Sequence, residues 1–298
     1  MPQPPWKPLL IQHLGTLNPP NFALATISSN AAPLNPPFCP PGAMHPPPPS
    51  IPSLVPRVRT MIYRGFFGTL PANPHTPLPN HNPPIMTSDM LTFTTDARMT
   101  KTGELTPDHT SGGDATRGTC GGAEVEMCFW MEEPQNQWRV RGRCYLLAEE
   151  DVDTSHEIQE ELKKRMEFSP EGDKDQWSWK KEVQAHFANL APAMRGSFSN
   201  PPPGTPVNVD LSQLENNTGG GEQLKKGTNV KNEDVLKMGG PEEIARRNMR
   251  VGVVVPEVVE RVDLAADDKT ARRWVWWFVG EQEGEGVKDG WKEIETFP

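Results

Sequence analysis

The sequence has no long apolar run, and this absence excludes several classes of protein. No N-terminal stretch has the apolar centre of a signal peptide, and no run is long enough to cross a membrane. The four cysteines among 298 residues, Cys39, Cys120, Cys128 and Cys144, form no Cys-x-x-Cys pair and show no metal-ligand spacing with histidine. We therefore expect a soluble, cytoplasmic protein with reduced thiols.

The chain also lacks an excess of basic charge. Its 30 Lys and Arg stand against 39 Asp and Glu, which gives a formal net charge of −9 and a pI near 5.4. This balance disfavours general nucleic-acid binding, so any anion site must be a local basic pocket in an acidic protein. No phosphate-loop spacing occurs, HEIQEELKKRM lacks the second histidine of a zinc-binding helix, and His75 and His81 have no third ligand nearby. We expect no metal.

Proline and glycine, by contrast, are abundant. The 34 Pro and 25 Gly cluster in stretches that cannot form packed helix or strand interiors. We read residues 1–298 as one domain with three excursions: a Pro-rich loop insertion at 31–56, a Gly-rich loop at 106–122 and a flexible polar loop at 207–240. The Pro-rich loop is either a PxxP ligand for a partner domain or a tolerated insertion between two strands.

Periodicity predicts the regular elements between these loops. Helical spacing predicts helices over residues 6–17, 156–166 and 177–190. Alternating or β-branched patterns predict strands over residues 22–28, 123–131, 137–148, 245–255 and 272–279, with 256–264 leading outward. A strand-dominated fold with a few helices follows from this pattern.

Two further strands carry basic residues on an otherwise apolar background. In PRVRTMIYRG, apolar and polar positions alternate with a period of two, and Arg59 and Arg64 lie near its two ends. In LTFTTDARMTK, a strand of β-branched and aromatic residues runs into a polar loop that contains Lys101. Hydroxyls and cations close together at a strand end can hold a phosphate through charge-assisted hydrogen bonds.

Four motifs in order along the chain resemble the pyridoxamine 5′-phosphate oxidase-like, FMN-binding split-barrel family, in particular its longer branch of FMN-binding domain-containing proteins. The first is Arg59 to Ile62 followed by Arg64, and the second is Thr95, Met99 and Lys101 in place of T-x-x-x-S-x-K. The third is Trp130 with Gln137, Arg139 and Gly142, and the fourth is Trp291 with Pro298 at the family's terminal spacing.

The resemblance implies a fold and a cofactor. The fold is mainly β (α+β): an antiparallel, Greek-key-like split β-barrel with a few peripheral helices and long Pro- and Gly-rich loops. The family's proteins are homodimers with FMN at the subunit interface, so the expected partners are FMN, a second copy and a small-molecule substrate. The residues that the resemblance places at the flavin are Arg59, Thr60, Met61, Ile62, Arg64, Thr94, Thr95, Met99, Thr100, Lys101, Gln137, Ser197 and Arg273.

Roles for these residues follow from the chemistry of FMN. Its phosphate carries nearly two negative charges, and Arg64 and Lys101 are the main candidates to hold it, with Arg59 toward the ribityl chain or ring edge. Gln137 is suited to the polar atoms of the ring. Arg273 is the candidate to stabilise charge near N1 and the C2 carbonyl of the reduced flavin.

Each assignment has a plainer alternative. Arg59 and Arg64 could be surface cations of an edge strand, and Gln137 could cap a turn. Trp274, Trp276 and Trp277 are expected to pack in the core or an interface rather than to stack on the flavin.

The sequence departs from true pyridoxine phosphate oxidases at substrate positions. Aligned through Arg273, Lys269 and Ala271 stand where those enzymes carry the Arg and His that engage substrate, and Val262 replaces a Trp that packs on the flavin. Met99 removes a phosphate-binding hydroxyl. We therefore expect an FMN-dependent oxidoreductase with an unidentified substrate; the alternatives are a non-catalytic FMN- or ligand-binding module and a genuine pyridoxamine 5′-phosphate oxidase. No catalytic residue is assigned.

Overall fold

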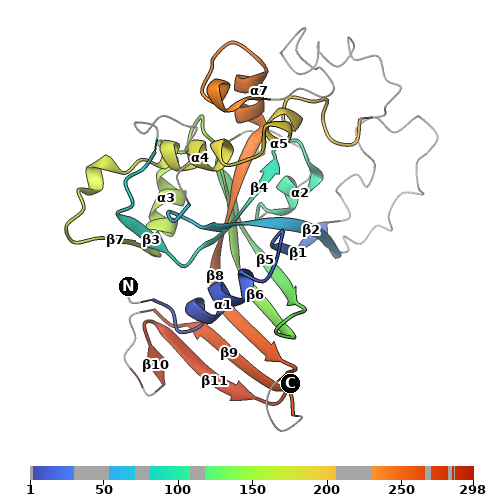
Figure 1. The fold of residues 1–298 in the computed structure, drawn as a ribbon, viewed down its shortest axis with the longest axis vertical. Coiled ribbons are helices and arrows are strands. Elements are labelled where there is room, and N and C mark those ends of the chain that lie inside the picture. Colours follow the sequence, from blue (N-terminus) through green and yellow to red (C-terminus); the bar gives the residue numbers. More distant parts are fainter. Residues whose placement is uncertain are drawn as a thin grey trace.

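A computed structural model describes residues 3–29, 54–70, 81–107, 118–205, 230–265, 270–280, 284 and 286–298. Most of the Pro-rich, Gly-rich and polar excursions lies outside these residues, as do Cys39, His75 and Lys269. The elements, coloured along the chain in Figure 1, are α1 (Lys7–Leu14), β1 (Asn21–Ser29), β2 (Leu54–Phe66), β3 (Met86–Ser88), β4 (Leu91–Asp96), α2 (Thr100–Glu104), β5 (Cys120–Met131), β6 (Asn136–Leu147), α3 (His156–Lys163), β7 (Met166–Phe168), η3 (Lys174–Gln176), α4 (Trp179–Ala188), α5 (Pro192–Ser197), η4 (Asn232–Asp234), α7 (Pro241–Asn248), β8 (Met249–Asp263), β9 (Arg272–Phe278), β10 (Val287–Lys288) and β11 (Trp291–Thr296).

An antiparallel sheet of nine strands organises the molecule. Its order is β10-β11-β9-β8-β4-β2-β1-β5-β6, and β6 also pairs with β8. The second pairing closes β8, β4, β2, β1, β5 and β6 into a barrel, which leaves β9, β11 and β10 as an extension. Figure 1 shows that extension on one side of the molecule, with α3, α4, α5 and α7 gathered at the other.

Strand β8 belongs to both parts of this sheet. On one edge it pairs with β6 from Val251 to Asp263. On the other edge it pairs first with β4, up to Val254, and then with β9, from Val258 onward. The barrel therefore splits open along β8, where β4 ends and β9 begins.

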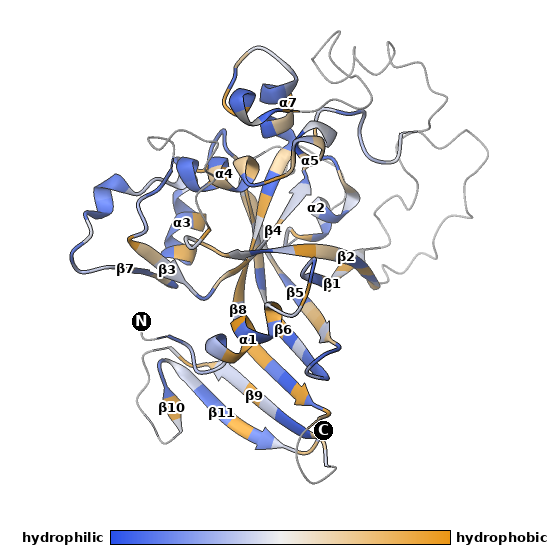
Figure 2. Ribbon diagram, in the orientation of Figure 1, coloured by the Kyte–Doolittle hydropathy of each residue, from blue (hydrophilic) through white to orange (hydrophobic). Residues whose placement is uncertain are grey.

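Two apolar cores lie on the two faces of the barrel wall. One fills the barrel interior with residues such as Phe93, Met127 and Val254. The other lies between the sheet and the helices, where Val253 packs with residues of α3, α4 and α7 such as Phe187. Adjacent valines of β8 thus face different cores, as expected for a strand buried on both sides, and Figure 2 shows the apolar character of this strand.

Most predicted elements are confirmed, but two predictions were wrong. Residues 245–248 form the end of α7 rather than part of a strand. Pro241 begins this helix, and acidic residues occupy its first turn. Arg246 and Arg247 lie in the last turn, where their positive charges interact favourably with the helix dipole. Residues 256–263 do not lead outward but continue β8. Pro256 is accommodated because the register of the ladder shifts beside it, opposite Gly142.

The polar segment after β4 is also more ordered than predicted. Thr100 and Lys101 lie in the short helix α2 rather than in a loop. The chain turns at Asp96, whose carboxylate accepts hydrogen bonds from the backbone and side chain of Arg98. This turn places α2 against β1.

Trp276 bears out the packing role expected for the C-terminal tryptophans. Its ring is 5% exposed and stacks on the ring of Trp138, with centroids 5.9 Å apart. It therefore belongs to the barrel core rather than to a ligand surface.

The closest approach of β6 and β8 gives a test of this register. A Cβ atom at Gly142 would lie 1.9 Å from the carbonyl oxygen of Val255, so we expect Gly142→Ala to lower the free energy of unfolding by about 2–3 kcal/mol. Gly284→Ala is the matched control, because the nearest atom to its Cβ is 3.7 Å away. Urea unfolding of both variants measures the difference, and equal stability would show that β6 and β8 are not paired in this register.

Candidate functional site

A cluster of charged residues lies at the end of the barrel where β1, β2 and α2 meet. Arg59 comes from β2, Thr26 from β1 and Glu104 from the end of α2. Nη2 of Arg59 lies 2.5 Å from Oε2 of Glu104, and Nη1 donates to the hydroxyl of Thr26 at 2.5 Å. That hydroxyl donates in turn to Glu104 at 2.6 Å. The network fixes the guanidinium beside α2.

Lys101 lies in the same cluster and is more deeply buried than Arg59. Its side chain is 7% exposed, and burial together with the nearby charge of Arg59 lowers its pKa to about 8; Asp96 and Glu104 oppose this shift only in part. Its ammonium group contacts the thioether sulfur of Met99 at 2.6 Å. That sulfur is the one hydrogen-bond acceptor of Lys101 within the described residues, although an ammonium carries three donors.

A third cation reaches this end of the barrel from β8. Arg250 pairs across the ladder with Thr95, whose hydroxyl lies 3.7 Å from the sulfur of Met99. The guanidinium of Arg250 is buried and donates to Glu150 at 3.0 Å and to two backbone carbonyls. It is therefore compensated locally, whereas Asp96 and Glu104 compensate the charge of Lys101 only in part.

The chemistry of the cluster favours an anion. A buried ammonium with only a weak sulfur acceptor is costly, and an anion with several oxygens would supply the missing acceptors. Arg59 has such an acceptor already, in the carboxylate of Glu104. Glu104 thus lies where it competes with an incoming anion for Arg59.

Arg64, predicted to share the phosphate with Lys101, lies elsewhere. It is five residues beyond Arg59 on β2 and projects from the other face of that strand. Its nearest charged environment is α4: burial, and then the charge of Arg64, lower the pKa of His186 to about 3. Nε of Arg64 is buried without a hydrogen-bond partner in the described part of the chain. The structure therefore brings Lys101 to Arg59 and not to Arg64.

Gln137 and Arg273 form a separate pair on the sheet. Both are register partners of Val262, near the end of β8, so their side chains share one face about 10 Å apart. Arg273 forms an ion pair with Glu260. Arg250, the register partner of Thr95, lies near the opposite end of β8, so one chain does not bring Gln137 and Arg273 to the Lys101 cluster.

Ser197 lies at the end of α5, next to the turn that follows β4. Its hydroxyl is exposed and donates to the carbonyl of Met194 at 2.7 Å. Arg98 connects the two segments, because it binds Asp96 and the carbonyl of Phe198. Ser197 is therefore near the turn that leads into α2.

The remaining predicted residues line the strands between these positions. Met61 is buried in the barrel core, Thr60 and Thr100 are exposed, and Ile62 and Thr94 are half-buried. Thr94 and Thr95 are adjacent in β4 and so face opposite sides of the sheet. Thr95 is the one directed toward the Lys101 cluster.

Sequence reasoning missed Thr26, Glu104 and Arg250. Glu104 follows Lys101 by three residues, which places it on the same face of a helix, but the segment was read as a loop. Thr26 and Arg250 reach the cluster through strand register, which the sequence does not specify. No local sequence pattern indicates that Thr26 or Arg250 belongs to this cluster.

No helix in the described part of the chain is long and apolar enough to span a membrane. The closed antiparallel barrel of β8, β4, β2, β1, β5 and β6 thus carries a cluster of basic residues at one end.

Comparison with known proteins identifies the family of the central segment. Residues 44–148, about a third of the chain, match the family model described as pyridoxamine 5′-phosphate oxidase, FMN-binding domain. This segment contains Arg59 and Lys101. The resemblance inferred from the sequence motifs is confirmed, and the cofactor of this domain family is FMN.

A solved structure supports the fold over the whole chain. A pyridoxamine 5′-phosphate oxidase-related, FMN-binding protein from Nostoc punctiforme PCC 73102 matches with a TM-score of 0.55 at 16% identity, covering 100% of both chains. PhzG from Burkholderia lata 383, in complex with tetrahydrophenazine-1-carboxylic acid, gives a TM-score of 0.43 at 15% identity, covering 100% of this chain and 97% of that one. No curated protein matches. The predicted mainly β, split-barrel fold is thus confirmed.

The burial of Lys101 predicts a measurable cost. Without flavin, we expect Lys101→Met to raise the free energy of unfolding by about 1–2 kcal/mol at neutral pH, because it removes a desolvated charge. The folded-state pKa of about 8 lies below 10.5, the ordinary pKa of a lysine side chain. The gain should therefore be full below pH 8 and fade as the pH rises toward 10.5, where both states have lost the proton.

Urea unfolding at several pH values between these limits measures this gain. The exposed Lys292→Met is the matched control for the loss of a lysine at the surface. A Lys101→Met variant that is less stable than the parent at neutral pH would contradict the assignment of Lys101 as an uncompensated buried cation.

Proposed function

We propose that this protein is a flavoprotein in which Lys101 and Arg59 hold the phosphate of FMN, and that it acts as an oxidoreductase on a small molecule. The observation that carries the proposal is the ammonium of Lys101, buried beside Arg59 with a thioether as its one described acceptor. A phosphate dianion would supply the charge and the oxygen acceptors that this environment withholds. Lys101 and Arg59 both lie within the segment that matches the FMN-binding family model.

Glu104 gives this site a built-in competitor. Its carboxylate accepts from both Arg59 and Thr26 at hydrogen-bond distance. For Arg59 to bind a phosphate, its ion pair with Glu104 must be broken at least in part. The free energy lost in breaking this ion pair weakens the binding of FMN. Lys101 then contributes more than Arg59 to the binding of FMN, because it gains hydrogen bonds to the phosphate without breaking an ion pair such as that of Arg59 with Glu104.

A second copy of the chain completes the proposal. Gln137 and Arg273, suited to the polar edge of the isoalloxazine ring, lie near the far end of β8 from the Lys101 cluster. A homodimer with FMN at its interface would let one subunit hold the phosphate while the partner offers Gln137 and Arg273 to the ring. The separation of the two groups within one chain supports this arrangement.

When bound, FMN supplies the hydride and electron transfer of the reaction. The protein's part is to position the ring and to balance its charge. Arg273 is the residue we assign to the reduced ring, although its ion pair with Glu260 offsets some of its charge. Lys269 and Ala271 stand where the pyridoxine phosphate oxidases carry the Arg and His that engage substrate, so we propose a different small-molecule substrate.

Substitutions at Lys101 and at Glu104, with opposite expected effects, test the phosphate site. We expect Lys101→Ala to weaken FMN binding by about tenfold to a hundredfold, the loss of one charge-assisted contact, while Lys101→Arg retains most of the affinity. Glu104→Gln should tighten binding, because it removes the competing charge from Arg59. Quenching of flavin fluorescence on titration with protein measures all three.

Unchanged affinity in Lys101→Ala would remove Lys101 from the site. Weaker binding in Glu104→Gln would show that the carboxylate supports the flavin rather than competes with it. Thermal unfolding of each variant without FMN separates these effects from loss of fold.

The oxidoreductase role has a spectroscopic test. We expect the FMN-bound protein to lose its visible flavin absorption when NADPH or NADH is added without oxygen, and to recover it when oxygen is admitted. Free FMN at the same concentration is the control for non-enzymatic reduction. A bound flavin that neither nucleotide reduces would favour a non-catalytic FMN-binding module.

A further inference from the structure

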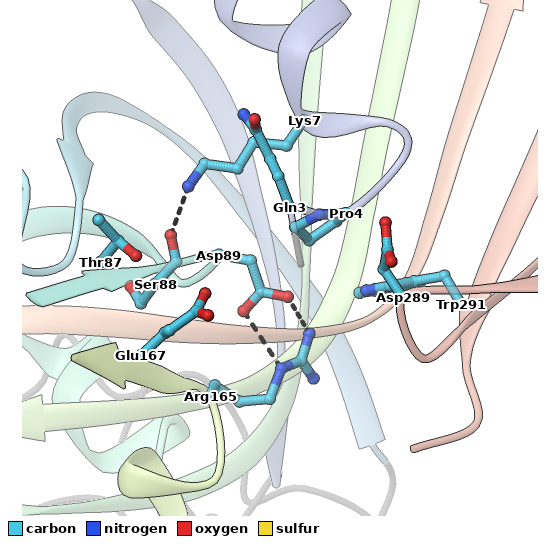
Figure 3. Close-up of a pocket in the computed structure, with 10 residues that line it drawn as sticks. All are labelled: Gln3, Pro4, Lys7, Thr87, Ser88, Asp89, Arg165, Glu167, Asp289 and Trp291. Atoms are coloured by element: carbon cyan, nitrogen blue, oxygen red, sulfur yellow. Dashed lines mark hydrogen bonds and ion pairs between the residues drawn. The ribbon is translucent and has the colours of Figure 1, made fainter. Parts of the chain in front are cut away.

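The sulfur of Met99 is an unusual neighbour for a buried cation. Two other buried cations contact oxygen: Figure 3 shows the ammonium of Lys7 on a backbone carbonyl, at 2.6 Å, and the guanidinium of Arg165 on a carboxylate. The ammonium of Lys101 instead contacts Sδ of Met99 at 2.6 Å, and this thioether is its one acceptor within the described residues. A thioether is a weak acceptor. Oxidation to a sulfoxide would turn the same side chain into a polar one, with an oxygen to accept from the ammonium.

Met99 is also accessible. It is 37% exposed, whereas the methionines of the two apolar cores, such as Met127 and Met249, are buried. The hydroxyl of Thr95 lies 3.7 Å from the Met99 sulfur and is a second donor beside it. A solute as small as hydrogen peroxide can therefore reach a sulfur that has donors ready for an added oxygen.

We propose that Met99 is a modification site for hydroperoxides, of which hydrogen peroxide is the simplest, and that its sulfoxide obstructs the binding of the flavin phosphate. This inference rests on the proposed function, because it takes Lys101 as the phosphate ligand. It adds a regulation of that site by oxidation.

The step balances with hydrogen peroxide as the oxidant. A lone pair of the Met99 sulfur attacks one peroxide oxygen, so an S–O bond forms as the O–O bond breaks. The ammonium of Lys101 gives a proton to the departing hydroxide, which leaves as water, and the resulting amine takes the proton of the new S–OH group. Sulfur is oxidised by two electrons and the peroxide is reduced by the same two. The products are methionine sulfoxide and water, and Lys101 is again an ammonium.

The sulfoxide competes with flavin for Lys101. Its oxygen is held covalently beside the ammonium and accepts a donor that the phosphate would otherwise use. Glu104 already competes for Arg59. Oxidation of Met99 therefore adds a competitor at the second cation of the site, and the affinity for FMN falls.

Peptide mass spectrometry of the full-length protein, treated with hydrogen peroxide before flavin is added, tests the modification. Met194 is the matched control, because it is 40% exposed and its sulfur lies 3.9 Å from a hydroxyl rather than beside an ammonium. We expect Met99 to be oxidised faster than Met194, and Lys101→Ala to abolish this difference by removing the proton donor. Saturation with FMN before treatment should slow the oxidation of Met99.

Fluorescence titration with FMN, before and after peroxide treatment, tests the effect on binding. We expect treatment to weaken FMN binding of the parent by about tenfold, through the loss of one charge-assisted contact. The affinity of Met99→Leu should not change on treatment. Met238→Leu is the control for oxidation elsewhere, because Met238 is 69% exposed and lies outside the cluster; this variant should lose affinity as the parent does.

Oxidation of Met99 no faster than that of Met194 would overturn the proposal. So would unchanged FMN affinity in a parent whose Met99 is fully oxidised, or an equal loss of affinity in Met99→Leu. The rate comparison uses the parent chain, so it holds whatever Met99→Leu does to the fold. A parent that fails to bind FMN before treatment would instead overturn the phosphate site of the proposed function, and the mass spectrometry would still decide whether Met99 is the oxidised residue.

Discussion

The double use of β8 is the constraint on which the rest of the structure depends. One edge of this strand pairs with β6, while the other edge pairs first with β4 and then with β9. Because β4 stops where β9 begins, the barrel is closed at one end and opened into a flat extension at the other. The same division separates the Lys101 cluster, beside the β4 half, from Gln137 and Arg273, beside the β9 half.

The sequence predicted the elements of this sheet better than their arrangement. Alternation and β-branched residues placed the strands β1, β2, β4, β5, β6 and β9 correctly, because these patterns are local. The prediction was wrong at residues 245–248 and 256–263, where a basic segment and a proline suggested the wrong boundaries. Pro256 is tolerated through a register shift opposite Gly142, a compensation that involves a strand more than a hundred residues away.

The same distinction applies to the candidate site. The motifs identified Arg59 and Lys101, which the structure brings together, and the family match covers both. The choice between Arg59 and Arg64 depends on which face of β2 each side chain occupies, and the motif spacing alone did not settle it. Glu104 was hidden by the reading of α2 as a loop, while Thr26 and Arg250 depend on register.

The position of β8 along the chain also bears on how the protein is made. Val140 of β6 pairs with Val259 of β8, and Thr95 of β4 pairs with Arg250 of β8. Both neighbouring strands are therefore synthesised long before β8. Until then the growing chain carries two unpaired strand edges, which are templates for association with other chains. These two edges are therefore exposed to such association until β8 has left the ribosome.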